Sequence, residues 1–242
     1  MQLTEKVHLI GSGEIGLSNS YDCHVYLVDG GDDAVIIDSG VGIEPERLKQ
    51  NVEKVMDWNK VSRIICTHSH ADHGGGSQFF QQEGKEVWLS DVENEWMQNN
   101  RDEVELALEL AINAGGYPQG YQFKYFQPDY LMKEEEAVKC GSLTLQPIHV
   151  KGHSPGMFCF YMETKDKNVL FSGDTVFVNG EIGLLNAPGS SLHDFREDMG
   201  KLADLKTDAL FPGHRLFVLS NGQEHVQMGI DQMSKVFTPR TF

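Results

Sequence analysis

A ten-residue stretch in the first third of the chain concentrates side chains that can bind metals. Residues 67–76 read THSHADHGGG, which places His68, His70, Asp72 and His73 within six positions. Imidazole and carboxylate groups are suitable ligands for zinc, manganese or iron. The three glycines that follow let the backbone turn tightly and approach a bound group. A solvated polar loop would not explain so dense a set, and the stretch therefore predicts a metal site.

Three further residues of the same types stand later in the chain, each behind an apolar run. His153 lies in KGHSPG, Asp174 in FSGDT and His214 in FPGHR. Each of these residues alone could be an ordinary turn residue or a turn cap. Because they follow THSHADHGGG in this order, we expect them to complete one ligand set.

The elements that must position these residues can be read from hydrophobic periodicity. We expect strands at Val7–Ile10, His24–Asp29, Ala34–Asp38, Val61–Cys66, Glu86–Ser90, Leu143–Val150, Met157–Met162, Val169–Ser172 and Asp208–Phe211. We expect helices at Glu44–Trp58, Ser77–Gln82, Asp91–Ala114 and Leu192–Leu205, and a last one that carries Val226, Ile230, Met233 and Phe237. GGDD at residues 30–33 predicts a hairpin turn. The interleaved pattern predicts one α/β domain over residues 1–242, with a helical and aromatic insertion around 91–136.

The motif HxHxDH followed by a distant His, Asp and His, each after a strand, resembles the metallo-β-lactamase superfamily. The resemblance covers nearly the whole chain and fills all seven expected positions. It implies a four-layer αββα sandwich of two mixed β-sheets, with helices outside and metals at one edge between the sheets. It also implies the ligand sets: His68, His70 and His153 for one metal, Asp72, His73 and His214 for the second, and Asp174 bridging both.

Two such ions have a clear chemical use. Two divalent cations carry about +4 charge, of which two carboxylates offset only half, and the excess lowers the pKa of a bridging water. Metal-bound hydroxide then exists at neutral pH, and one metal polarises the scissile carbonyl or phosphoryl oxygen. Zinc is the expected metal, with iron and manganese as alternatives. Asp72 and Asp174 are the catalytic candidates, and Asp72 is either a proton shuttle or a pure ligand.

Other residues near these motifs have weaker patterns. Asp38, in IIDSG, matches a family position that supports the site, although a turn cap is the alternative. Thr67 either hydrogen-bonds near the ligands or has no role there. His149 is expected to lie outside the ligand set. The remaining histidines are interpreted as structural or surface residues: His8, His24, His193 and His225.

Among the branches of the family, THSHADHGGG, GHSPG, GDT and PGH are most similar to glyoxalase II and lactonase-like hydrolases. The resemblance therefore implies cleavage of a thioester or lactone. Residues 215–242 are too few for the helical region with which glyoxalase II usually holds glutathione. One alternative is an oxidoreductase similar to mononuclear iron persulfide dioxygenases, and another is a non-catalytic metal-binding module.

The 91–136 segment is rich in aromatic residues, and its role has two interpretations. It either forms a wall for an apolar acyl group or packs on the core or on a second copy in a homodimer. Arg215 is either a partner for a substrate carboxylate or a surface residue. The residues of the 91–136 segment to which its two interpretations apply are Trp96, Met97, Tyr117, Tyr121, Phe123, Tyr125, Phe126 and Tyr130.

Composition excludes several classes of partner. The chain has 20 Lys and Arg against 36 Asp and Glu, a net charge of −16, which disfavours nucleic acid and anionic membrane surfaces. No run of 18 apolar residues is present, and the N-terminus lacks a signal-peptide pattern. We therefore expect a cytoplasmic protein with a small-molecule substrate. Without a CxxC pair, the cysteines are expected to be buried free thiols: Cys23, Cys66, Cys140 and Cys159.

Overall fold

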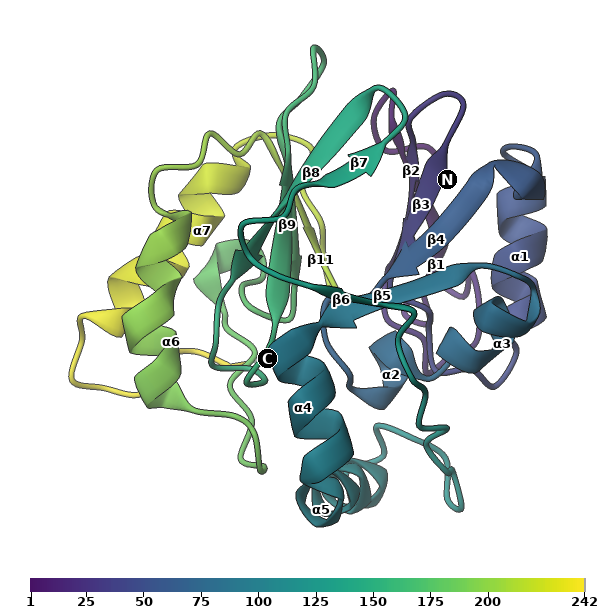
Figure 1. Ribbon diagram of the computed structural model, residues 1–242. Helices are drawn as coiled ribbons and strands as arrows, with labels where there is room; N and C mark the ends of the chain where they lie inside the picture. The colour runs from purple at the N-terminus through teal and green to yellow at the C-terminus, as the bar shows by residue number, and fades with distance from the viewer. Residues whose placement is uncertain (242) are drawn as a thin grey trace.

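Two β-sheets face each other at the centre of the molecule, and helices cover their outer faces (Figure 1). The computed structural model describes residues 1–241. The six-stranded sheet has the order β1-β2-β3-β4-β5-β6, formed by Val7–Gly11, Val25–Asp29, Ala34–Ile37, Val61–Ile65, Glu86–Ser90 and Tyr130–Met132. The five-stranded sheet has the order β11-β10-β9-β8-β7, where β7 to β11 are Val138–Cys140, Leu143–His149, Phe158–Met162, Val169–Gly173 and Ala209–Pro212.

Both sheets are mixed, as predicted. β1, β2 and β3 pair antiparallel, whereas β3 to β6 pair parallel. In the second sheet only β10 and β11 pair parallel. The GGDD turn joins β2 to β3 as an antiparallel hairpin, with Asp29 opposite Ala34. The predicted αββα sandwich is confirmed.

The helices lie on the outer faces and at one end of the sandwich. They are α1 (Pro45–Glu53), α2 (Ala71–Gly74), α3 (Ser77–Gln82), α4 (Asp91–Asn99), α5 (Arg101–Asn113), α6 (Leu192–Asp198) and α7 (Gly222–Met233). In Figure 1, α1 and α3 lie on the side of the first sheet, α6 and α7 on the side of the second, and α4 and α5 below both. Within residues 1–241, no helix combines the length and apolar character needed to cross a membrane.

Strands β1 to β3 of the first sheet are buried on both faces, which explains their nearly continuous apolar sequences. Successive side chains of a strand point to opposite faces. Leu27 and Ile36 therefore pack under the helices, whereas Tyr26 and Ile37 pack against the second sheet. The Tyr26 ring stacks on that of Phe211 at 5.4 Å between centroids. This inter-sheet core fixes how the two sheet edges meet.

Several helix boundaries differ from the predicted ones. The helix expected over 44–58 ends at Glu53, and Trp58–Lys60 forms a separate 3-10 turn capped by Asp57. The helix expected over 91–114 is broken at Asn100, whose φ of −117° and ψ of 42° are not helical. Apolar periodicity continues across such breaks, so it does not reveal them.

The C-terminal third also departs from the expected bounds. The helix expected over 192–205 is α6 followed by a 3-10 turn at Met199–Leu202. The last helix ends at Met233, and Phe237, expected on its apolar face, is 79% exposed. The three-residue strands β6 and β7 were not predicted, because each is defined by pairing with a neighbouring strand.

The segment 91–136 packs partly on the core, in agreement with one of its two interpretations. Met97, Leu108, Phe123 and Phe126 belong to the buried cluster beneath the first sheet. After α5 the chain returns along the molecule to β6 without regular structure between Tyr121 and Pro128.

Candidate metal centre

All seven predicted ligand residues converge at one edge of the sandwich, because each follows the C-terminal end of a strand. Those of the THSHADHGGG stretch come after β4, on the loop and on α2, and the other three lie after β8, β10 and β11. The two sheets thus contribute four and three residues to one cluster: His68, His70, Asp72 and His73 from the first, and His153, Asp174 and His214 from the second.

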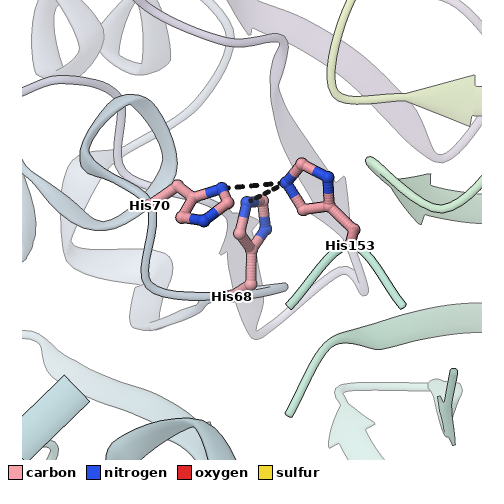
Figure 2. A group of neighbouring side chains, drawn as sticks. All are labelled: His68, His70 and His153. Carbon is pink, nitrogen blue, oxygen red and sulfur yellow. Dashed lines mark hydrogen bonds between the residues drawn. The ribbon is translucent and has the colours of Figure 1, made fainter. Parts of the chain in front are cut away.

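Three histidine side chains point their ring nitrogens at one another (Figure 2). The Nε2 of His153 lies 3.1 Å from the Nε2 of His68 and 2.8 Å from the Nδ1 of His70. The Nδ1 of His153 faces the Gly183 carbonyl at 2.5 Å, and a carbonyl can only accept, so Nδ1 carries the hydrogen. Burial lowers the pKa of His153 to about 3, so its Nε2 presents a lone pair to the other two rings.

A second group lies beside the first. The Nε2 of His214 is 2.9 Å from Oδ2 of Asp72 and 3.3 Å from the Nε2 of His73. The Nε2 of His73 is 3.6 Å from the same Asp72 oxygen. Burial alone would raise the pKa of Asp72, but the neighbouring histidines outweigh it and lower the pKa below its ordinary value. These three side chains therefore present two nitrogens and one charged oxygen to a common point.

Asp174 lies between the two groups. Its Oδ2 is 3.6 Å from the Nε2 of His153 and 3.5 Å from that of His214, and its Oδ1 is 3.4 Å from the Nε2 of His73. Oδ1 is buried and has no hydrogen-bond partner among residues 1–241. A buried carboxylate oxygen without a donor is costly unless a cation compensates it. Together with the facing lone pairs of the histidines, this atom shows that the donor set fits divalent cations of the zinc type.

Asp38 and Thr67 stand behind the cluster and orient it. Oδ2 of Asp38 lies 2.8 Å from Nδ1 of His73, and its Oδ1 accepts the Thr67 backbone N–H at 2.7 Å. The Thr67 hydroxyl lies 3.0 Å from Nδ1 of His68. Asp38 takes a φ of 65°, in the left-handed region. Asp38 and Thr67 thus contact the Nδ1 atoms of His73 and His68. Residues that orient a metal-ligating histidine typically contact the ring nitrogen that does not bind the metal.

Glu93 was not identified from the sequence. Its Oε1 accepts the backbone N–H and the hydroxyl of Ser69 at 3.0 and 2.7 Å. Its Oε2 accepts the Ser154 hydroxyl at 2.9 Å and the Gly156 N–H at 2.8 Å. The only sequence signal was S-x-x-E from Ser90, a helix-capping pattern, and Ser90 does cap α4. The fully buried carboxylate instead joins the loop of His68 and His70 to the loop of His153.

Tyr117 also touches the cluster. Its hydroxyl donates to Oδ1 of Asp72 at 2.6 Å. Burial and the Asp72 charge hold the pKa of Tyr117 well above its ordinary value, so the hydroxyl keeps its proton. The sequence marked Tyr117 only as one aromatic residue of the 91–136 segment, because nothing in the local pattern connects it with a position 45 residues away.

Residues predicted to lie outside the ligand set do so. The Nε2 of His149 faces the Pro155 carbonyl at 2.9 Å, and that of His24 faces the Arg215 carbonyl at 2.7 Å. The Arg215 guanidinium pairs with Glu181 at 2.8 Å. All four cysteines are buried and free, as predicted.

Comparisons with known proteins agree with this geometry. Residues 20–214 match the family model described as the metallo-beta-lactamase superfamily. The acyl-coenzyme A thioesterase MBLAC2 of Bos taurus is 27% identical over 207 residues, which cover 79% of this chain and 72% of that protein. The hydroxyacylglutathione hydrolase GloC of Haemophilus influenzae is 27% identical over 207 residues, which cover 84% and 86%.

A solved structure shows the same fold. The metallo-beta-lactamase family protein TTHA1429 of Thermus thermophilus superposes with a TM-score of 0.72 at 21% identity, over 96% of this chain and 80% of that one. The family model covers well over half of the sequence, including all seven residues of the cluster. The chain therefore belongs to the metallo-beta-lactamase superfamily.

Proposed function

We propose that this chain is a dinuclear, zinc-dependent hydrolase that cleaves a thioester bond, with lactones as the second substrate class. The observation that carries the proposal is the convergence of five imidazoles and two carboxylates in one cluster, in which the buried Oδ1 of Asp174 has no hydrogen-bond donor among residues 1–241. The relatives named as an acyl-coenzyme A thioesterase and a hydroxyacylglutathione hydrolase favour a thioester over a lactone.

Each part of the cluster has a place in this proposal. His68, His70 and His153 would hold one ion, Asp72, His73 and His214 would hold the other, and Asp174, which lies between the two groups, would be available to both. When bound, the ions supply a hydroxide nucleophile at neutral pH by lowering the pKa of water, and they polarise the substrate carbonyl.

The protein's own groups keep these ligands in the required state. The Gly183 carbonyl fixes the Nδ1–H tautomer of His153, so that Nε2 faces the site. Asp38 holds His73 in the same way. Tyr117 donates to Oδ1 of Asp72, which leaves Oδ2 directed at His214. We propose that Asp72, as a carboxylate at the reacting centre, also accepts and returns a proton during hydrolysis.

The test is proton release measured with a pH indicator on a panel of acyl thioesters, lactones and phosphodiesters. We expect zinc-loaded wild type to release protons from thioesters. His70→Ala and Asp174→Ala should each lower turnover by more than the ~10²-fold that loss of an outer partner of a metal ligand can cost. Circular dichroism should show that both variants keep the fold.

His193→Ala is the matched control, because that side chain is exposed and lies outside the cluster. It should keep wild-type turnover. The proposal fails if His70→Ala, stripped of metal by a chelator, still hydrolyses at the wild-type rate. Bound iron together with oxygen uptake on a glutathione persulfide would favour the oxidoreductase instead. Absence of bound metal after gentle purification would favour a non-catalytic module.

A further inference from the structure

A cavity of about 270 Å³ opens directly beside the ligand cluster. Its lining includes Ser69, His70 and Ala71, and His70 is itself one of the residues of the cluster. From there it runs between α5 and the loop 185–187, with the Tyr117 and Trp96 rings in its walls. A group placed in this cavity would therefore begin at the reacting centre.

The walls are apolar because of the spacing on α5. Ala107 and Leu108 lie three and four positions after Val104, and Ala111 lies four and three positions after them, so these residues share one face of the helix. The small alanine side chains on this face leave the space open. The residues that line the cavity include no Lys, Arg, Asp or Glu, although the chain as a whole carries 56 of them (20 Lys and Arg with 36 Asp and Glu).

The volume sets the size of the group that fits. A dry apolar cavity of about 150 Å³ accommodates benzene, so 270 Å³ has room for on the order of ten carbon atoms. The cavity thus suits a linear chain of medium length and is larger than an acetyl group requires.

We propose that this cavity binds the acyl chain of the thioester substrate and makes the enzyme prefer medium-length acyl groups to acetyl. The proposal rests on the proposed hydrolase activity. Thiol carriers are polar or charged, and an apolar cavity does not match that half of the substrate. The acyl half begins at the carbonyl carbon, which must lie at the ions beside His70. The chain attached to it then enters the cavity, and the thiol half stays towards solvent.

The acyl chain itself does not react. In the hydrolysis, the oxygen of a water molecule bonds to the acyl carbon and the C–S bond breaks; one proton of the water goes to the leaving thiolate and the other is released to solvent. The products are a carboxylate with the same chain and a free thiol. The cavity therefore acts through binding of the chain, which can raise kcat/KM with each methylene it covers.

The kinetic test compares acetyl, hexanoyl and decanoyl thioesters of one thiol on the zinc-loaded enzyme. We expect kcat/KM of wild type to rise with chain length, by up to about fourfold per buried methylene. Ala107→Phe should fill the cavity and lower kcat/KM for the decanoyl thioester by at least about tenfold. The kcat/KM for the acetyl thioester should fall much less, because an acetyl group leaves most of the cavity unfilled.

Leu106→Phe is the matched control, since Leu106 is the neighbour of Ala107 on α5 but is 47% exposed and does not line the cavity. It should keep the wild-type chain-length profile. Ala111→Leu, on the same face as Ala107, is the second filling variant if Ala107→Phe does not fold. Equal kcat/KM for all three thioesters in wild type would overturn the proposal while leaving the hydrolase in place.

Binding gives a readout that does not depend on turnover. Trp96 lines the cavity, so octan-1-ol should change the tryptophan emission of wild type, and ethanol should not. The change should be lost in Trp96→Phe, and in Ala107→Phe it should need at least about tenfold more octan-1-ol. If no thioester is hydrolysed but this binding pattern holds, the proposed function fails and the apolar site stands. If octan-1-ol changes nothing in wild type, the cavity is not a chain site.

Discussion

The carboxylates of Glu93 and Asp174 are both buried, but they differ in whether hydrogen bonds from the protein compensate the burial. Glu93 receives four hydrogen-bond donors, two on each oxygen, so its burial is compensated by the protein alone. Asp174 is also buried, yet its Oδ1 receives no donor among residues 1–241. The difference separates a residue that joins two loops from one that leaves an oxygen available to a cation.

At this scale we predict that Glu93→Gln weakens one half of the proposed centre. A glutamine amide would direct its own hydrogens at the donors of Ser69, Ser154 or Gly156, so the two histidine loops would separate. The zinc affinity of the His68–His70–His153 group should fall by about 10–100-fold. Competition with a chelator measures it.

The matched control is Glu95→Gln, two positions away on α4 but exposed. It should keep the zinc affinity of wild type. In Glu93→Gln the Asp72–His73–His214 group should keep its affinity. An equal loss at both positions would indicate that Glu93 only stabilises the fold and does not position one ligand group.

At the scale of elements, the loop between β8 and β9 is held against the start of α4. The Ser90 hydroxyl donates to the Gly156 carbonyl at 2.6 Å, and a Cβ added at Gly156 would collide with the backbone nitrogen of Glu93. This close approach lets Glu93 reach the loop that carries His153. Because β5 of the first sheet leads directly into α4, this contact joins the end of β5 to the second sheet.

Gly156→Ala should therefore separate α4 from this loop. We expect the free energy of unfolding to fall by roughly 1–3 kcal/mol, the usual cost of overpacking a filled position. Gly200→Ala is the control, because a Cβ there meets nothing within 4 Å, and it should be neutral or slightly stabilising. Urea unfolding of both variants measures the difference, and equal midpoints would show that α4 can move without cost.

At the scale of the whole molecule, the proposed ions would connect the two sheets. The first sheet supplies the histidines after β4, and the second supplies His153, Asp174 and His214. The inter-sheet core of aliphatic and aromatic residues already holds the sheets together, so the fold does not depend on metal alone. A ligand that binds only the folded chain nevertheless adds stability by mass action.

We predict that removing zinc with a chelator lowers the melting temperature without unfolding the protein at room temperature. Free zinc at a hundred times its dissociation constant contributes about 2.7 kcal/mol per site. Calorimetry of metal-free and zinc-loaded wild type measures the increment, and it should shrink in Asp174→Ala. Identical melting temperatures for the two wild-type preparations would contradict a metal that binds across the sheets.

The sequence by itself predicted which residues gather in the cluster, and the resemblance of its motifs to the metallo-β-lactamase superfamily predicted the class of fold. His68, His70, Asp72 and His73 lie within six positions, and each of the three later residues follows an apolar strand, so their order along the chain and the family resemblance were enough to group them. The hairpin turn and most strands follow from patterns of the same short range. Helix ends were less certain, because apolar periodicity runs past breaks such as Asn100.

Only the tertiary structure decided what surrounds the ligands. Tyr117 meets Asp72 across 45 positions, and Ser154 meets Glu93 across 61. Such contacts depend on how the two sheets and α4 and α5 pack, and no local pattern encodes a contact over that separation. The cavity has the same origin: Ala107 and Ala111 leave space beside His70 only because α5 is placed against the loop 185–187.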